Sequence, residues 1–323
     1  MLYIGTNNSS RESKVLSQKN IYTSIGLMSG TSLDGVDSAI IQTDGDMHIK
    51  FIQSGYMPYN QAFKDHLYKA CRQDMPLYEL LSLEEELTGL HAKAVKHVLK
   101  EAGLKADDVD IIGFHGQTIR HLPEEGITHQ LGNGPLLKEQ TGIRVAYDFR
   151  KADMAAGGEG APLVPVFHQA LFANHKKPVG VVNIGGVSNI TWLGENGQMS
   201  ASDCGPGMGL LDRWVQSQTG QAYDDAGALA QQGTIDMAVV ERAFDSIPFF
   251  KSPPPKSADR YDFDNVDVSH LSVEDGAATL CALTAHSIIE TAKAMPQEPK
   301  ELWLTGGGAK NQLVLDLKIV MLH

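Results

Sequence analysis

Apolar and β-branched segments alternate with amphipathic segments along this chain, which predicts alternating strands and helices. Three β-branched segments joined by short Gly and Asp turns predict a β-meander: Ile21 to Ser29, Val36 to Thr43 and His48 to Tyr56. The tetrapeptide Ser82-Leu83-Glu84-Glu85 has the pattern of a capping box. Apolar residues follow it at spacings of three and four, so we expect a long helix that Gly103 ends.

The rest of the chain continues the alternation and repeats part of it. The further elements that we expect are strands at Val109 to Phe114 and Gly142 to Asp148, a helix at Ala161 to Asn174, a glycine hairpin at Val181 to Asn189, and a helix from the capping box at Ser272 to Ala294. Because the hairpin resembles the first meander, the pattern predicts an α/β fold of two related lobes. We place the lobes at residues 21–135 and 136–323, after a flexible extension at residues 1–20.

Composition narrows the class of protein. With 323 residues and 42% hydrophobic content, the chain is large enough for two packed domains. Its formal net charge of −12 argues against a nucleic-acid partner, because phosphate backbones need a basic surface. The three cysteines form no CxxC pair, and the first twenty residues lack an apolar signal segment. We therefore expect a cytoplasmic protein with reduced thiols and no membrane partner.

Three glycine-rich turns follow apolar segments, at Gly30 to Asp37, Asn183 to Asn189 and Thr305 to Ala309. Glycine lets backbone N–H groups approach an anion closely, so we expect a nucleotide held between the two lobes, although tight hairpins or a flexible link would look similar. Asp34 or Asp37 would hold Mg²⁺. The residues expected at ATP are Gly30, Thr31, Ser32, Leu33, Asp34, Gly35, Val36, Asp37, Asn183, Gly185, Gly186, Gly306, Gly307 and Gly308.

Polar residues near other turns are candidates for the reacting substrate. Asp203 precedes a Gly-Pro-Gly turn, where it acts either as a turn former or as a general base. The segment from His115 to His121 has a histidine spacing that suits no metal site, and its polar side chains suit a carboxylate-bearing ligand better. Charged residues from Asp148 to Asp153 are either a solvated cluster or part of the same site. The residues expected at the substrate are Gln117, Thr118, Arg120, Asp148, Glu159 and Gly205.

Eight segments in order resemble the anhydro-N-acetylmuramic acid kinase family, which belongs to the actin, hexokinase and Hsp70-like ATPase superfamily. They are GLMSGTSLDGVD from Gly26, GFHGQTIRH from Gly113, VAYDFRKAD from Val145, GGEGAPLVP from Gly157, VNIGGVSNIT from Val182, DCGPG from Asp203, PPPKS from Pro253 and LTGGGAKN from Leu304. The resemblance implies two ribonuclease-H-like lobes with a nucleotide cleft between them, and a homodimer.

The resemblance also implies a reaction. ATP and water would convert 1,6-anhydro-N-acetylmuramic acid into N-acetylmuramic acid 6-phosphate during peptidoglycan recycling, with Asp203 matching the family's catalytic aspartate. The γ-phosphoryl group would take the oxygen that leaves C1, so one carboxylate base suffices. A sugar kinase of another specificity, or a protein that only binds ATP or sugar, would share many of these features.

One residue and one segment depart from the family pattern. Met208 stands where the family has Asn after Gly-Pro-Gly. The segment Gln312 to His323 does not match the family well, so we expect the C-terminal part of the second lobe to be truncated, with weaker stability and adenosine binding.

Overall fold

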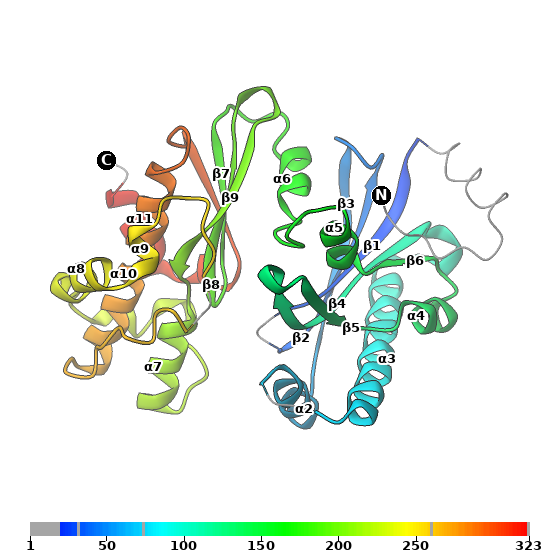
Figure 1. Cartoon of the computed structure of the whole chain (residues 1–323), viewed down its shortest axis with the longest axis horizontal. Helices are drawn as coiled ribbons and strands as arrows, with labels where there is room; N and C mark the ends of the chain where they lie inside the picture. Colours follow the sequence, from blue (N-terminus) through cyan, green and yellow to red (C-terminus); the bar gives the residue numbers. More distant parts are fainter. Residues whose placement is uncertain (1–19, 31–32, 73–74, 259–260, 322–323) are drawn as a thin grey trace. The chain divides into compact units, whose positions relative to one another are not determined.

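The computed structural model describes residues 20–30, 33–72, 75–258 and 261–321, which form two compact units (Figure 1). Unit 1 ends at Leu163 and unit 2 begins at Val164. This division falls later than the boundary expected at residues 135 and 136, because the short strand β6 (Val145–Tyr147) pairs in parallel with β4 (Ile111–Leu122). Except for residue 20, the predicted N-terminal extension lies outside the described residues.

The sheet of unit 1 has the strand order β3-β2-β1-β4-β5, with β6 beside β4. Its remaining strands are β1 (Tyr22–Ser29), β2 (Gly35–Thr43), β3 (Ile49–Pro58) and β5 (Ile127–Leu131). β1, β2 and β3 are antiparallel neighbours, which confirms the predicted meander, whereas β4 runs parallel to β1. β4 also extends through the segment that we had expected to follow the strand, because residues 117–122 pair with β5.

Unit 1 is closed by the helices α2 (Gln61–Arg72), α3 (Leu77–Ala102), α4 (Gly134–Thr141) and α5 (Phe149–Ala155). The capping box expected at Ser82 is wrong: α3 begins five residues earlier, after Pro76, because Leu77 to Leu81 continue the helical pattern. The predicted end is confirmed, since Gly103 adopts a left-handed conformation (φ 67°) and its N–H donates to the carbonyls of Leu99 and Lys100 in the last turn. The buried stripe of α3, including Leu83 and Leu87, packs on the core of unit 1.

Unit 2 contains a four-stranded sheet in the order β10-β7-β8-β9. Its strands are β7 (Val179–Ile184), β8 (Val187–Leu193), β9 (Met199–Pro206) and β10 (Glu301–Thr305). β7, β8 and β9 are antiparallel neighbours, and β10 runs parallel to β7. The four strands therefore repeat the connectivity of β1 to β4, which confirms that the two halves of the chain are related in topology.

The central helix of unit 2 is α10 (Val273–Lys293), and several of the other helices of this unit pack against it. The others are α6 (Pro165–Leu171), α7 (Gly209–Thr219), α8 (Met237–Ser246), α9 (Pro248–Lys251) and α11 (Gln312–Met321). Ser272 caps α10 as predicted, accepting a 3.1 Å hydrogen bond from Asp275 N–H. α10 is rich in small residues, and its Gly276 lies against the Trp214 indole where a Cβ would come within 2.7 Å of the ring. Among the described residues, no helix is long and apolar enough to cross a bilayer.

Candidate active site

The first glycine-rich turn links β1 to β2 in unit 1. Thr31 and Ser32, both expected at ATP, lie outside the described residues. Leu33 has a left-handed backbone (φ 57°), and its N–H donates to the Gly30 carbonyl at 3.2 Å. A leucine with positive φ is strained, which is typical of residues held in a functional loop. Gly35 has a packing requirement, since a Cβ there would lie 2.4 Å from the Met57 carbonyl oxygen.

Two carboxylates lie near each other on this turn and the strand that follows. Burial raises the pKa of Asp37, and the negative charge of Asp34 raises it further. The same two carboxylates add to the effect of burial in raising the pKa of Tyr56. Val36 between them is buried in the core. Because Mg²⁺ is usually held by one or two carboxylates together with substrate phosphates, this oxygen donor pair fits that ion. Among the described residues, no cluster of three or more metal-ligating side chains occurs.

A buried chain of hydrogen bonds fixes the strand end before this turn. Ser29 Oγ donates to Gln117 Oε1 at 2.6 Å, and Tyr59 Oη lies 2.8 Å from the same Ser29 oxygen. Burial raises the pKa of Tyr59 above its ordinary value. Gln117, expected at the substrate, is only 1% exposed. In this structure its side chain therefore ties β4 to the end of β1.

Two other residues of β4 that we expected at the substrate lie close to α2. Arg120 Nη1 donates to the carbonyls of Cys71 at 2.6 Å and Ile119 at 2.8 Å, and lies 3.4 Å from that of Ala70. The guanidinium thus satisfies carbonyls at the C-terminal end of α2, where a cation is favourable. Thr118 Oγ1 is buried and has no hydrogen-bond partner among the described residues.

The start of α5 gathers further charged groups. Asp148 precedes the helix with a left-handed backbone (φ 60°), and its Oδ1 forms a 2.8 Å ion pair with Lys151 Nζ. Asp153 Oδ2 accepts the N–H of Gly160 at 2.8 Å, which shapes the turn that carries the exposed Glu159. Arg150 belongs to the charged segment that the sequence left as either a solvated cluster or part of the site. Its Nε donates to His115 Nε2 at 3.0 Å, a contact between residues 35 positions apart that no spacing rule reveals.

In unit 2, the second and third glycine-rich turns lie together. β10 pairs with β7 so that Thr305 is opposite Asn183. Gly306 is left-handed (φ 84°), and a Cβ there would lie 2.6 Å from Asn183 Oδ1. A Cβ on Gly308 would lie 2.3 Å from Ile184 Cγ2. The structure therefore brings together residues of both turns that we expected at ATP.

Two glycines in these turns have no structural requirement for glycine. At Gly186 and Gly307, a Cβ would meet no described atom within 4 Å, and neither backbone lies in the left-handed region. An unhindered Cα facing open space lets a ligand approach the backbone closely. These positions therefore fit the bound phosphates or ribose of a nucleotide.

The Gly-Pro-Gly turn docks on the second glycine-rich turn. Met208 N–H donates to the Gly185 carbonyl at 2.7 Å, and Gly207 N–H donates to that of Gly186 at 3.1 Å. A Cβ on Gly207 would lie 2.1 Å from Gly185 O, so this glycine is required by the close approach. Gly205 is left-handed (φ 148°), and its carbonyl accepts the buried Ser188 hydroxyl at 3.1 Å. The two turns are thus joined by backbone hydrogen bonds.

Asp203 lies on β9 directly before that turn. Its N–H donates to the Lys256 carbonyl at 2.8 Å, while the Ala258 N–H donates to Asp203 Oδ2 at 2.8 Å. Burial raises the pKa of Asp203, and hydrogen bonds from Ala258 and the Ser257 hydroxyl act in the opposite direction. The carboxylate is therefore both oriented and kept available as a proton acceptor.

A second perturbed carboxylate, which the sequence did not indicate, lies in the first turn of α7. Burial and the nearby charge of Asp224 raise the pKa of Asp212 to about 6. Asp224 itself accepts the N–H groups of Leu229 at 2.8 Å and Ala230 at 3.0 Å. Asp224 therefore organises the loop after α7, and its negative charge adds to the proton affinity of Asp212.

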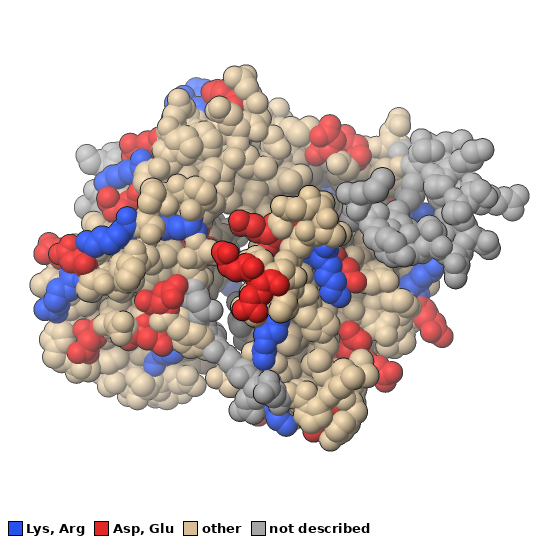
Figure 2. Space-filling model, viewed as in Figure 1, with Lys and Arg blue, Asp and Glu red and all other residues tan. Residues whose placement is uncertain are grey.

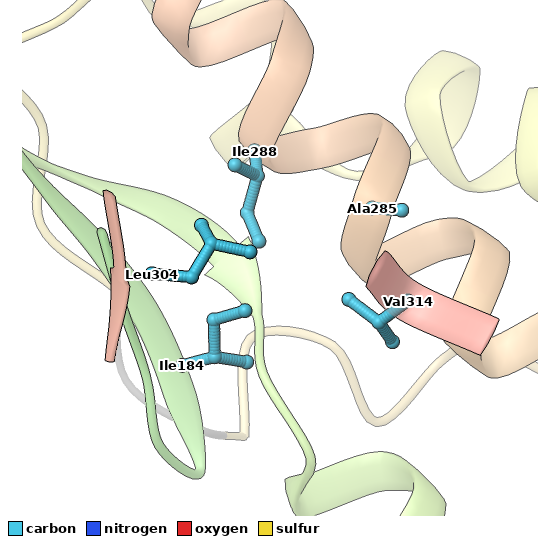
Figure 3. Close-up of a pocket in the computed structure, with 5 residues that line it drawn as sticks. All are labelled: Ile184, Ala285, Ile288, Leu304 and Val314. Atoms are coloured by element: carbon cyan, nitrogen blue, oxygen red, sulfur yellow. The ribbon is translucent and has the colours of Figure 1, made fainter. Parts of the chain in front are cut away.

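An apolar pocket lies beneath the sheet of unit 2. The pocket is lined by Ile184 and Leu304 from the sheet, Ala285 and Ile288 from α10, and Val314 from α11 (Figure 3). Without a polar group in its lining, it offers no hydrogen bond to a nucleotide.

On the face in Figure 2, the described Lys and Arg side chains are scattered among Asp and Glu, with no continuous basic surface.

Comparison with known proteins identifies relatives. The family model for anhydro-N-acetylmuramic acid kinase matches residues 22–322. A protein of that name from Rhizorhabdus wittichii is 45% identical over 300 residues, covering 91% of this chain and 82% of its own length. A protein of the same name from Agrobacterium fabrum is 42% identical over 308 residues, covering 92% and 82%. A solved structure of a ROK family glucokinase from Streptomyces griseus, in complex with glucose and AMPPNP, matches 93% of this chain and 88% of its own. The sequence identity is 12% and the TM-score is 0.42, so this likeness carries no argument.

The C-terminal expectation needs correction. The family match continues to residue 322, so the interpretation that Gln312 to His323 departs from the family is wrong, and the matches do not support a truncated second lobe. In the structure, α11 packs against α10, and its Val314 is 1% exposed.

Proposed function

Because this chain belongs to the anhydro-N-acetylmuramic acid kinase family, we propose that it uses ATP and water to convert 1,6-anhydro-N-acetylmuramic acid into N-acetylmuramic acid 6-phosphate and ADP. The oxygen of water bonds to C1 while the bond from C1 to O6 breaks. O6 takes the γ-phosphoryl group as the bond to the β-phosphate oxygen breaks. The proton from water passes to Asp203, and ADP leaves.

The observation that carries this proposal is the setting of the Asp203 carboxylate. A general base needs a raised proton affinity and a fixed orientation. Burial supplies the first, and the 2.8 Å bond from Ala258 N–H to Oδ2 supplies the second. The attacking water would give its proton to this carboxylate. The phosphoryl group takes the leaving oxygen, so no second carboxylic acid is needed.

The glycine-rich turns support binding of ATP. In unit 2, open space beside Gly186 and Gly307 allows close approach to the backbone. In unit 1, Asp34 and Asp37 form the oxygen donor pair that would hold Mg²⁺ through its water shell. When bound, Mg²⁺ neutralises charge on the phosphates and orients the γ-phosphoryl group. The chain's own residues would position the reactants, which is the largest protein contribution in such transfers.

The wider expectations join this proposal. We propose that both units are ribonuclease-H-like lobes, which the shared strand connectivity supports. We retain residues 21–135 and 136–323 as the proposed functional lobes of the sequence, with the structural division at Leu163 and Val164 as the alternative boundary. The residues proposed at the sugar remain Gln117, Thr118, Arg120, Asp148, Glu159 and Gly205. As the family resemblance implies, the protein would act in the cytoplasm as a homodimer.

Product analysis tests the proposal. The chain is incubated with Mg-ATP and the anhydro-sugar, and the sugar product is examined by mass spectrometry and phosphorus NMR. The proposal predicts a product that has gained both a phosphoryl group and one water, with phosphate on C6. Gain of a phosphoryl group alone would indicate a kinase acting on a free hydroxyl. ATP binding with no altered sugar would indicate a protein that binds without catalysing.

A further inference from the structure

Arg150 in α5 is a half-buried cation that has no acidic partner among the described residues. Its Nε donates to His115 Nε2 at 3.0 Å, and no carboxylate among the described residues pairs with it. Burial is what lowers the pKa of Arg150. An arginine keeps its charge in proteins, so the guanidinium lacks compensation among the described residues of unit 1. A buried charge is costly unless it is paired.

His115 holds the guanidinium without neutralising it. The Nδ1 atom of His115 lies 2.8 Å from the Gly116 carbonyl oxygen, which requires a proton on Nδ1. Nε2 is then the acceptor for Arg150, so the ring is neutral. Burial and the nearby Arg150 charge both lower the pKa of His115, in agreement with this tautomer. The contact occupies Nε of Arg150 and leaves the paired Nη groups for another acceptor.

Nearby carboxylates are engaged elsewhere. Asp148 pairs with Lys151 at 2.8 Å, and Asp153 accepts the Gly160 N–H at 2.8 Å. Glu159 is exposed, and its charge acts on His121. These acidic groups would repel a polyanion such as a triphosphate. A ligand with a single negative charge matches the one uncompensated guanidinium better.

We propose that Arg150, oriented by His115, binds the lactyl carboxylate of the sugar substrate and sets the preference for a muramic acid over neutral amino sugars. This inference rests on the proposed function, because the lactyl carboxylate is the one anionic group of the anhydro-sugar. The planar guanidinium presents two parallel N–H donors that fit a carboxylate in bidentate geometry. The phosphates of ATP are the other source of an anion, and the experiment distinguishes them.

The test compares 1,6-anhydro-N-acetylmuramic acid with its neutral methyl ester. We expect the unaltered protein to show a KM for the acid at least about tenfold below that for the ester, as for a charged hydrogen bond. In Arg150→Gln, the KM for the acid rises to that for the ester, while the KM values for the ester and for ATP stay unchanged. Lys138→Gln is the control, because it removes an exposed charge of α4 that takes no part in these contacts.

Two outcomes would contradict this role of Arg150. A retained preference for the acid in Arg150→Gln overturns the inference, and so does a rise confined to the KM for ATP, which would place a phosphate at Arg150. If Arg150→Gln fails to fold by circular dichroism, Arg150→Lys is used, and partial loss of the preference is expected. If the unaltered protein shows no turnover, the proposed function fails. Calorimetric binding of acid and ester to both proteins without ATP then still decides the role of Arg150.

Discussion

The backbone N–H of Ala258 donates to Oδ2 of Asp203 at 2.8 Å, although the two residues are 55 positions apart. Segment 256–258 is itself held to β9, because Asp203 N–H donates to the Lys256 carbonyl and Lys256 N–H donates to Ser202 Oγ at 3.0 Å. The carboxylate thus has a partner that does not depend on side-chain rotation. This segment orients the proposed base.

Ser257→Ala should shift the acidic limb of the pH dependence of kcat to higher pH. The Ser257 hydroxyl stabilises the ionised Asp203, so its loss raises the pKa of that carboxyl. One hydrogen bond to a charged group corresponds to a shift of about one pKa unit. Activity should therefore fall mainly below the new pKa and recover at alkaline pH. Ser252→Ala is the control, since the exposed Ser252 is outside the contacts of Asp203. Equal losses at every pH would contradict this role.

Alanine at Gly186 or Gly307 should weaken ATP binding and spare folding. A Cβ meets no described atom at either position, so the folded unit accommodates it and the unfolded chain loses entropy. Calorimetry should show a Kd for ATP raised about tenfold or more, with an unchanged or slightly higher Tm.

Gly207→Ala and Gly308→Ala are the matched comparison for those glycines. There a Cβ would lie 2.1 Å from Gly185 O or 2.3 Å from Ile184 Cγ2, so both variants should lose stability. If all four substitutions lowered the Tm alike, open space at Gly186 and Gly307 would not explain their glycines.

Asp212→Asn should flatten the dependence of stability on pH. The folded pKa of Asp212, about 6, lies above its unfolded value near 3.9, so the folded state holds the proton more tightly. The free energy of unfolding therefore falls as pH rises from about 4 to about 6. Above pH 6, Asp212→Asn should be more stable than the unaltered protein by about 1–2 kcal/mol, allowing for solvent screening.

Urea unfolding across pH 4 to pH 8 checks the effect at Asp212. The two proteins should converge below pH 4, where Asp212 is protonated in both states. Asp245→Asn, at an exposed ion pair with Lys251, should follow the unaltered protein throughout. Parallel curves for Asp212→Asn would show that this carboxylate does not cause the pH dependence.

Arg120→Met should lower the Tm of the protein. The substitution leaves the carbonyls of Cys71 and Ile119 without the donor that meets them at 2.6 and 2.8 Å. A loss of about 1–3 kcal/mol in the free energy of unfolding is expected. Lys96→Met, at an exposed position of α3, is the control for loss of a charge. An unchanged Tm would contradict this stabilising role, which Arg120 would have in addition to its proposed contact with the sugar.

Local pattern predicted much of the fold, and contacts distant in sequence account for what it missed. The meander of β1 to β3 and the cap at Ser272 depend on adjacent residues, so both were predictable. β4 was predicted too short because its second half is stabilised by pairing with β5. The structural division at Leu163 and Val164 falls later than the predicted lobe boundary because β6 joins the sheet of unit 1 through a parallel pairing that periodicity does not reveal.

The candidate site shows the same limit. Motif order identified the glycine-rich turns and Asp203 directly from the sequence. The contact between His115 and Arg150, 35 positions apart, depends on how β4 meets α5. The proton affinity of Asp212 depends on burial and on Asp224, which also lies outside any local motif. Sequence therefore indicated the chemistry, and the structure was needed to show which charges lack partners.

The most direct test of the central claim is ADP release that depends on the anhydro-sugar, measured for the unaltered protein, Asp203→Asn and Asp245→Asn. Our account predicts turnover only when the anhydro-sugar is present, loss of about a hundredfold or more in Asp203→Asn, and full activity in Asp245→Asn. Equal turnover by Asp203→Asn, or ADP release indifferent to the sugar, would contradict the assignment of Asp203 as the base that activates water.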